Sequence, residues 1–281
     1  MVWLPFLVVA AEVVITYSRL PAHELYHVSG SGLEGGLGRA LVFSNFPVAL
    51  VAIAVLAFVA DRASARWTVV VASVGAILCA AVIWPGVVDE ADLDARPVNA
   101  VSAAGVLIAL VLTALALRGG AEWSRRQRGD SVRVAVAVVA VCLALPWLAA
   151  ELGFFLDGVP LLGRLFQTGR YSADVALPGV HHGHHHGIDG VLLLLAALLL
   201  SRAVPSIRHR VIRVATAAYL ALMAAYGIAN AANDFWSEQI VKRAWTMWAI
   251  PNVLHPKLSI AWALIVLGAG ALYAIASEAA R

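Results

Sequence analysis

Charged residues are scarce in this sequence. Asp, Glu, Lys and Arg together make up 13% of the 281 residues, whereas hydrophobic residues make up 62% and the mean hydropathy is +0.85. This composition excludes an ordinary soluble domain. Only two cysteines occur, Cys79 and Cys142, and both lie within apolar runs, so neither a disulfide framework nor a thiolate metal site is expected. Short segments of alternating polarity are also lacking, which argues against an outer-membrane barrel.

Long apolar runs recur along the whole chain. A bilayer crossing takes about 20 helical residues, and backbone polar groups in lipid must be satisfied internally. These runs therefore predict an all-α, polytopic helical bundle in the membrane. About eight spans are expected, at Val2–Leu20, Leu41–Ala60, Trp67–Val88, Val101–Leu117, Val134–Leu156, Ile188–Val204, Val211–Asn233 and Leu258–Ile275. Residues 1–281 are predicted to form a single transmembrane domain.

Arginines concentrate in alternate loops, which predicts the orientation. The clusters follow the second, fourth and sixth spans and contain Arg62, Arg66, Arg118, Arg125, Arg126, Arg128, Arg133, Arg202, Arg208, Arg210 and Arg213. By the positive-inside rule these loops and both termini are cytoplasmic, in a plasma (inner) membrane. The net charge of +3 reports orientation rather than a nucleic-acid partner. Eight of the nine histidines then lie on the extracytoplasmic side, with His209 as the exception.

The first histidine cluster follows the first span directly. His23, Glu24 and His27 form H-E-x-x-H, which on a helix places both imidazoles on one face. The same face of the preceding span carries a polar stripe formed by Glu12, Thr16 and Arg19. Ionisable residues within a span usually face the bundle interior and mark a functional path. The alternative for Glu12 is a structural pairing with Arg19.

The second cluster is LPGVHHGHHHGIDGVLLLL, from Leu177 to Leu195. If the sixth helix begins within it, one face carries His182, His185, His186 and Asp189. His181 and His184 are further candidates. Glycine recurs every fourth residue in this run, a spacing that lets helix backbones approach closely. Neutral imidazoles bind zinc, iron, copper or nickel, so the run is a candidate metal site. The alternative is a solvent-exposed, metal-scavenging loop.

Three further candidates lie on the same predicted side: Glu151, Asp234 and His255. A carboxylate there would complete a two-histidine zinc site or hydrogen-bond a ligating imidazole. On the seventh span a four-residue spacing links Tyr226, Asn230, Asp234 and Glu238. The alternative for the two acids is an ion pair with Lys242 or Arg243 at the helix end.

The predicted outer loops are 20–40, 157–190 and 234–257. The last of these contains Trp236, Trp245 and Trp248 among charged residues. Because tryptophan concentrates at membrane interfaces, we expect an amphipathic helix lying on the outer leaflet.

HELYH resembles the zincin motif over five residues. That resemblance implies that His23 and His27 bind zinc and that Glu24 activates water. No zincin third-ligand pattern follows, and the Asp-Gly partner motif of intramembrane zinc proteases is not apparent. The two clusters also resemble the histidine boxes of membrane fatty-acid desaturases and hydroxylases, which hold two irons. His23 and His27 match a first box, and His182, His185 and His186 match a later one, whereas a third box is missing unless His255 contributes to it.

The sequence therefore favours a membrane enzyme with a metal site at its extracytoplasmic face. Zinc is the favoured cofactor and iron the alternative. The expected reaction is hydrolysis of a lipid or another hydrophobic, membrane-embedded substrate, with Glu24 as general base. One alternative function is a non-haem iron lipid oxidase or hydroxylase. The other is a transition-metal transporter or sensor, in which Glu12 and Glu151 pass the ion inward.

Overall fold

The computed structural model describes residues 2–19, 30–84, 87, 95–118, 127–151, 158–161, 186–241, 243–254 and 256–279. All regular elements in this part of the chain are helices. The main ones are α1 (Trp3–Arg19), α3 (Gly32–Phe43), α4 (Ala49–Arg62), α5 (Arg66–Ala80), α6 (Asn99–Arg118), α7 (Asp130–Glu151), α9 (His186–Ser201), α10 (Arg210–Phe235) and α11 (Ile260–Ala279). The short ones are the π-helices η1 (Ser44–Val48) and η4 (Trp236–Val241) and the 3₁₀-helices η2 (Ala81–Ile83) and η3 (Val204–Ser206). The predicted all-helical class is confirmed for the described residues.

Several of these helices are suited to a lipid environment. Five segments are long and apolar enough to cross a membrane: Gly32–Arg62, Arg66–Ile83, Asn99–Arg118, Arg210–Phe235 and Ile260–Glu278. Two shorter apolar helices cover Trp3–Ser18 and His186–Ser201. Large apolar side chains such as Leu4, Ile77 and Val266 are exposed on the helices, as expected for a surface that faces lipid. The chain is thus a membrane protein, while the number of eight crossings and their orientation remain predictions.

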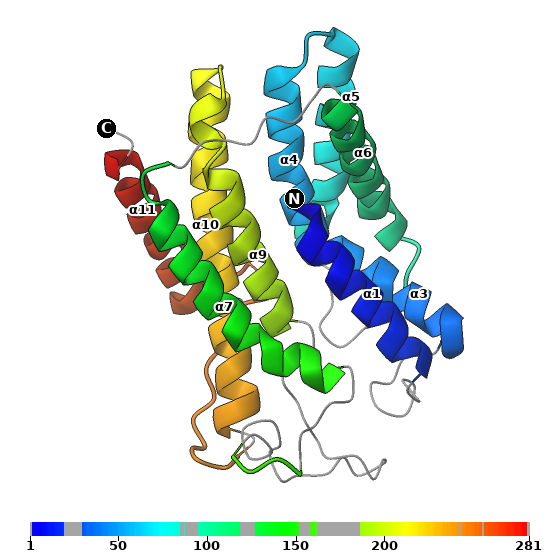
Figure 1. Ribbon diagram of the computed structural model, residues 1–281, viewed down its shortest axis with the longest axis vertical. Helices are drawn as coiled ribbons and strands as arrows, with labels where there is room; N and C mark the ends of the chain where they lie inside the picture. The colour runs from blue at the N-terminus through cyan, green and yellow to red at the C-terminus, as the bar shows by residue number, and fades with distance from the viewer. Residues whose placement is uncertain are drawn as a thin grey trace.

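The helices pack in neighbouring groups (Figure 1). Helix α1 lies along α3, while α4, α5 and α6 pack against one another. Helix α10 packs between α9 and α11, and α7 lies against α9. Contacts of α4 with both α9 and α10 join the groups. Because successive long helices alternate in direction, the bundle has two distinct ends.

Glycines allow the closest of these helix contacts. A Cβ placed on Gly190 of α9 would lie 2.5 Å from the carbonyl oxygen of Gly227 on α10, and a Cβ on Gly227 would lie 2.5 Å from the carbonyl oxygen of Gly190. A Cβ on Gly105 of α6 would lie 2.7 Å from the backbone nitrogen of Cys79 on α5. Only glycine fits such backbone contacts, as is usual between membrane helices.

Helices α3 and α4 form one continuous helical segment through η1. Pro47 lies inside η1, where it cannot donate a backbone hydrogen bond. Asn45 stabilises this irregular turn, because its Nδ2 donates to the carbonyl oxygen of Leu41 at 2.8 Å and its Oδ1 accepts from the hydroxyl of Ser102. The helix begins at Gly32, nine residues before the expected start of the second span. Residues 32–40 of the predicted outer loop 20–40 are therefore helical.

One end of the bundle, called here the arginine end, carries the exposed Arg62, Arg118, Arg128 and Arg208. Asp61 at the end of α4 accepts hydrogen bonds from the backbone N–H groups of Arg208, at 2.8 Å, and His209, at 2.9 Å. These are unsatisfied donors at the start of α10, so Asp61 caps that helix from another helix.

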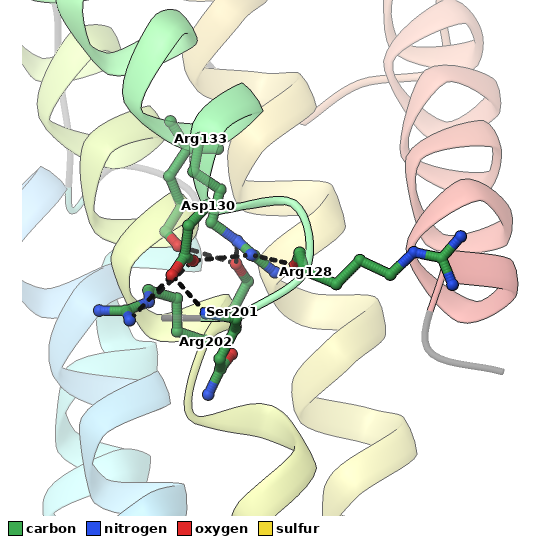
Figure 2. A network of polar contacts seen from close by, with 7 residues as sticks. Arg128, Asp130, Arg133, Ser201 and Arg202 are labelled. Carbon is green, nitrogen blue, oxygen red and sulfur yellow. Dashed lines mark hydrogen bonds and ion pairs between the residues drawn. The ribbon is translucent and has the colours of Figure 1, made fainter. Parts of the chain in front are cut away.

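A second polar network at the arginine end joins α7 to α9 (Figure 2). Asp130 accepts from Arg133 at 3.1 Å and from both Nε and Nη2 of Arg202 at 3.0 Å. Arg133 Nε donates to the hydroxyl of Ser201 at 3.0 Å, and its Nη1 donates to the carbonyl oxygen of Arg128. Two arginines thus hold the start of α7 against the end of α9.

The opposite end, called here the histidine end, is where α1 ends and α9 begins at His186. The prediction of an amphipathic helix over 234–257 is wrong in its second half. The helix ends at Val241, and residues 246–253 have no regular secondary structure. Ala244 ends the helix with a positive φ of 60°, and its N–H donates to the carbonyl oxygen of Val241. Trp236 Nε1 then donates to the carbonyl oxygen of Trp248 at 2.8 Å, which folds the segment back onto η4.

Candidate functional site

The structure bears on only part of the predicted metal site. His23, Glu24, His27, His181, His182, His184, His185 and His255 lie outside the described residues. Of Arg19 and Glu151 only the helical backbone is described. The members with described side chains are Glu12, Thr16, His186, Asp189 and Asp234. A predicted meeting of the HELYH motif with the HHGHHH run therefore remains a prediction.

Glu12 faces the interior of the bundle, as predicted from its place in an apolar span. It is 5% exposed, and its Oε1 accepts a hydrogen bond at 3.0 Å from the hydroxyl of Thr16, one turn later on α1. Val13 and Tyr17 beside them are fully buried. The stripe predicted on this face of α1 is thus internal at Glu12 and Thr16.

The cation near Glu12 is Arg39 of α3, which is not among the residues predicted for the site. Arg39 is 5% exposed, and its guanidinium carbon lies 5.8 Å from the ring centre of Tyr17 on α1. Such a position over an aromatic face favours a cation. Gly36, less than one turn before Arg39, makes the approach possible, because a Cβ there would lie 2.6 Å from the carbonyl oxygen of Val14. Glycine-rich packing of α3 on α1 thus places a buried charge beside Glu12.

Asp189 is the second acid near Arg39. It lies on α9, one turn after His186, and is 5% exposed. The Arg39 guanidinium interacts electrostatically with the carboxyl groups of both Glu12 and Asp189. We call Glu12, Arg39 and Asp189 the buried charge cluster. It combines two acids, on α1 and α9, with one base on α3.

The start of α9 is held against α10 next to this cluster. Gly190 follows Asp189 directly, and a Cβ on it would lie 3.1 Å from Cβ of Asn230 on α10. Asn230 and Asp234 are both buried. Tyr226, one turn before Asn230, is also buried and donates its hydroxyl to the carbonyl oxygen of Leu254 at 2.7 Å. The four-residue spacing on α10 thus marks an inner face from Tyr226 to Asp234.

Several polar atoms in this region are enclosed and have no hydrogen-bond partner among the residues that the structure describes. They are Oε2 of Glu12, Nε of Arg39, Oδ1 of Asp189 and Nδ2 of Asn230. An enclosed polar atom without a partner is destabilising by about 1–3 kcal/mol, so each such atom needs an explanation. Two of the four are acceptors and two are donors.

The described residues alone form no metal site. Within 2–19, 30–84, 95–118, 127–151, 186–241 and the shorter described stretches, no group of three His, Cys, Asp or Glu side chains is arranged to hold a metal ion. A site built mainly from His23, His27, His182 and His185 is not tested by that result. The second histidine cluster continues directly into α9, which begins at His186. The first turn of α9 contains the buried Asp189 and contacts the bundle interior.

Comparisons with family models, with curated proteins and with solved structures gave no match for this chain. Arg39 had one signal in the sequence, which is the glycine spacing of GLEGGLGRA just before an apolar run. That spacing is typical of closely packed membrane helices.

Proposed function

We propose that the protein is an integral membrane enzyme with a metal-dependent, hydrolytic site at the histidine end of the bundle. The observation that carries the proposal is the buried charge cluster of Glu12, Arg39 and Asp189. Charged groups inside a membrane bundle are costly, and they usually mark a substrate or ion pathway. Here all three lie on helices that adjoin the histidine segments in sequence. Helix α1 precedes HELYH, α3 follows it, and α9 begins at the last histidine of HHGHHH.

In this proposal His23, His27 and His186 are metal ligands, together with His182 or His185. Imidazole ligands suit zinc, and two or three of them with a carboxylate make a common catalytic set. Zinc held there would supply a bound water with a pKa of about 7. Glu24 would then serve as the general base, and the remaining acids would orient the imidazoles through hydrogen bonds.

The substrate in this proposal is a lipid or another membrane-embedded molecule. The support is the apolar character of the helices that surround the charge cluster. Phe6, Val9 and Val13 of α1 are buried, whereas Leu4, Leu7 and Val8 are exposed on the same helix. A hydrophobic substrate can therefore approach the site through lipid, while its polar part meets the charged groups.

Elemental analysis of protein purified without a histidine tag tests the proposal. We expect stoichiometric zinc in the wild-type protein. Glu24→Gln should keep the zinc and lose hydrolysis, because the general base is not a ligand. Wild-type protein without any bound transition metal would overturn the proposal. Iron in place of zinc would instead favour the oxidase or hydroxylase.

A further inference from the structure

The arginine end carries exposed positive charge where α4 meets the start of α10. Arg62 ends α4, Arg208 precedes α10 and Arg210 begins it, and all three side chains are exposed. Arg62 Nη2 donates to the hydroxyl of Ser206 in η3 at 2.7 Å, and the backbone N–H of Arg208 donates to Asp61 at 2.8 Å. These contacts hold the end of α4 beside the segment that leads into α10. We call Arg62, Arg208 and Arg210 the arginine patch.

The charge of the arginine patch is not paired within the described part of the chain. Its three side chains form no ion pair with any residue that the structure describes. Asp61 is buried, and both of its carboxylate oxygens already accept from backbone N–H groups. Asp130 pairs with two other arginines, and Glu278 lies near the end of α11, which α10 separates from α4 (Figure 1). The patch is therefore a cationic surface that is open to an anion from outside the protein.

The patch lies at the level where the helices become apolar. On α10 the exposed Arg210 is followed by Val211, which is 80% exposed, and by Val214, which is 46% exposed. On α5, which starts at the same end, the exposed Arg66 is followed by Trp67, which is 59% exposed. Tryptophan concentrates at membrane interfaces. Because both helices change from charged to exposed apolar side chains within one turn, this level matches that of the lipid headgroups.

We propose that the arginine patch binds the phosphate of an anionic phospholipid in the leaflet that meets the arginine end. Guanidinium donors match phosphate oxygens, and basic clusters beside a membrane attract anionic lipids. The exposed apolar surface of α10 that begins at Val211 suits the acyl chains, which favours a lipid over a soluble anion. This site lies at the opposite end of the bundle from the proposed metal site and does not depend on it.

A choice of probes separates charge from acyl chains. The protein in a neutral detergent is titrated with short-chain phosphatidylglycerol, with short-chain phosphatidylcholine and with soluble glycerol phosphate. Phosphatidylcholine has a phosphate but no net charge, and glycerol phosphate has no acyl chains. Binding is read from the shift in the thermal unfolding midpoint. We expect phosphatidylglycerol to bind at least about tenfold more tightly than the other two, and this preference should shrink at high salt because exposed charges are screened.

Substitutions test whether the patch is the site. Arg62→Gln, Arg208→Gln and Arg210→Gln should each weaken phosphatidylglycerol binding by about fivefold, as expected for one basic side chain near a membrane surface. Ser206→Ala removes the hydrogen-bond partner of Arg62 but keeps its charge, so it should bind as the wild type does. Arg128→Gln is the matched control, because it removes the same charge from an exposed arginine of another segment at the same end (Figure 2). It should also keep the wild-type affinity.

Four results would count against this inference. Equal affinity of the wild-type protein for phosphatidylglycerol and phosphatidylcholine would overturn it. An equal loss of binding in Arg128→Gln and Arg62→Gln would replace the site by a diffuse effect of net charge. A loss in Ser206→Ala as large as that in Arg62→Gln would assign the effect to the contact between α4 and η3 rather than to charge. Equal affinity for glycerol phosphate would overturn the assignment to a lipid.

Discussion

Gly36 of α3 lies directly against the backbone of Val14 on α1. A Cβ at Gly36 would be 2.6 Å from the carbonyl oxygen of Val14 and 3.3 Å from its Cα. This contact fixes the distance between two helices that contribute Glu12 and Arg39 to one cluster. The lack of a side chain at Gly36 therefore allows the packing that positions two buried charges.

Substitution of Gly36 by alanine should destabilise the protein. The added methyl group meets backbone atoms, which cannot move as a flexible side chain can, and overpacking of this kind costs about 1–3 kcal/mol. Gly38→Ala in the same helix is the control, because among the described residues its Cβ would meet only Cβ of Ala95, at 3.8 Å. Alanine stabilises a helix by up to about 1 kcal/mol relative to glycine, so Gly38→Ala should be neutral or stabilising. Denaturant unfolding in detergent measures the stability of both variants. Equal stabilities would contradict the close contact between Gly36 and Val14.

Removal of the Asp61 carboxylate should destabilise the start of α10. Asp61→Ala leaves the N–H groups of Arg208 and His209 without their acceptor, which costs about 1–2 kcal/mol for a helix cap. The matched control is Glu278→Ala, since Glu278 is an exposed acid near the end of α11. Thermal unfolding of the two variants should differ by several degrees. If Asp61→Ala loses no more stability than Glu278→Ala, a capping role of Asp61 is ruled out.

The Asp130 network should make stability depend on acid pH. The hydrogen bond from the backbone N–H of Gln127, together with the charges of Arg202 and Arg133, holds the pKa of Asp130 below its usual value. The ionised form is thus favoured by folding. Its contribution is complete above the unfolded pKa of about 3.9 and is lost as the pH falls through the lower folded pKa.

Asp130→Asn isolates that contribution because the amide does not titrate. The difference in stability between wild type and Asp130→Asn should be constant above about pH 5 and should shrink toward pH 3. A difference that stays constant down to pH 3 would contradict the lowered pKa. Unfolding measured in a non-ionic detergent across this range provides the test.

Hydropathy predicted the helices well, because each expected span corresponds to a helix of the described structure. It also predicted that Glu12 faces inward, since an ionisable group in an apolar helix avoids lipid. Arg39 was missed because GLEGGLGRA has low helix propensity and was assigned to a loop. Packing of its glycines against α1 overrides that propensity, and such a contact between segments is not visible in local sequence.

The segment after α10 was predicted less well. Its tryptophans and charges favour an amphipathic helix, but Ala244 adopts a positive φ and Pro251 follows soon after. Hydrogen bonds from the side chains of Trp236 and Asn233 to backbone oxygens hold the segment instead. These long-range bonds depend on the tertiary fold, which periodicity does not report.

The zinc content of His186→Ala, compared with that of His209→Ala, tests the central claim most directly. His186 begins α9 at the histidine end, next to the turn that carries Asp189, whereas His209 lies at the start of α10 at the arginine end. If the metal site is built from the two histidine segments, His186→Ala should lose most of the zinc because one ligand is a large share of a small coordination shell. His209→Ala should keep the wild-type content. Equal zinc content in the two variants would contradict the account.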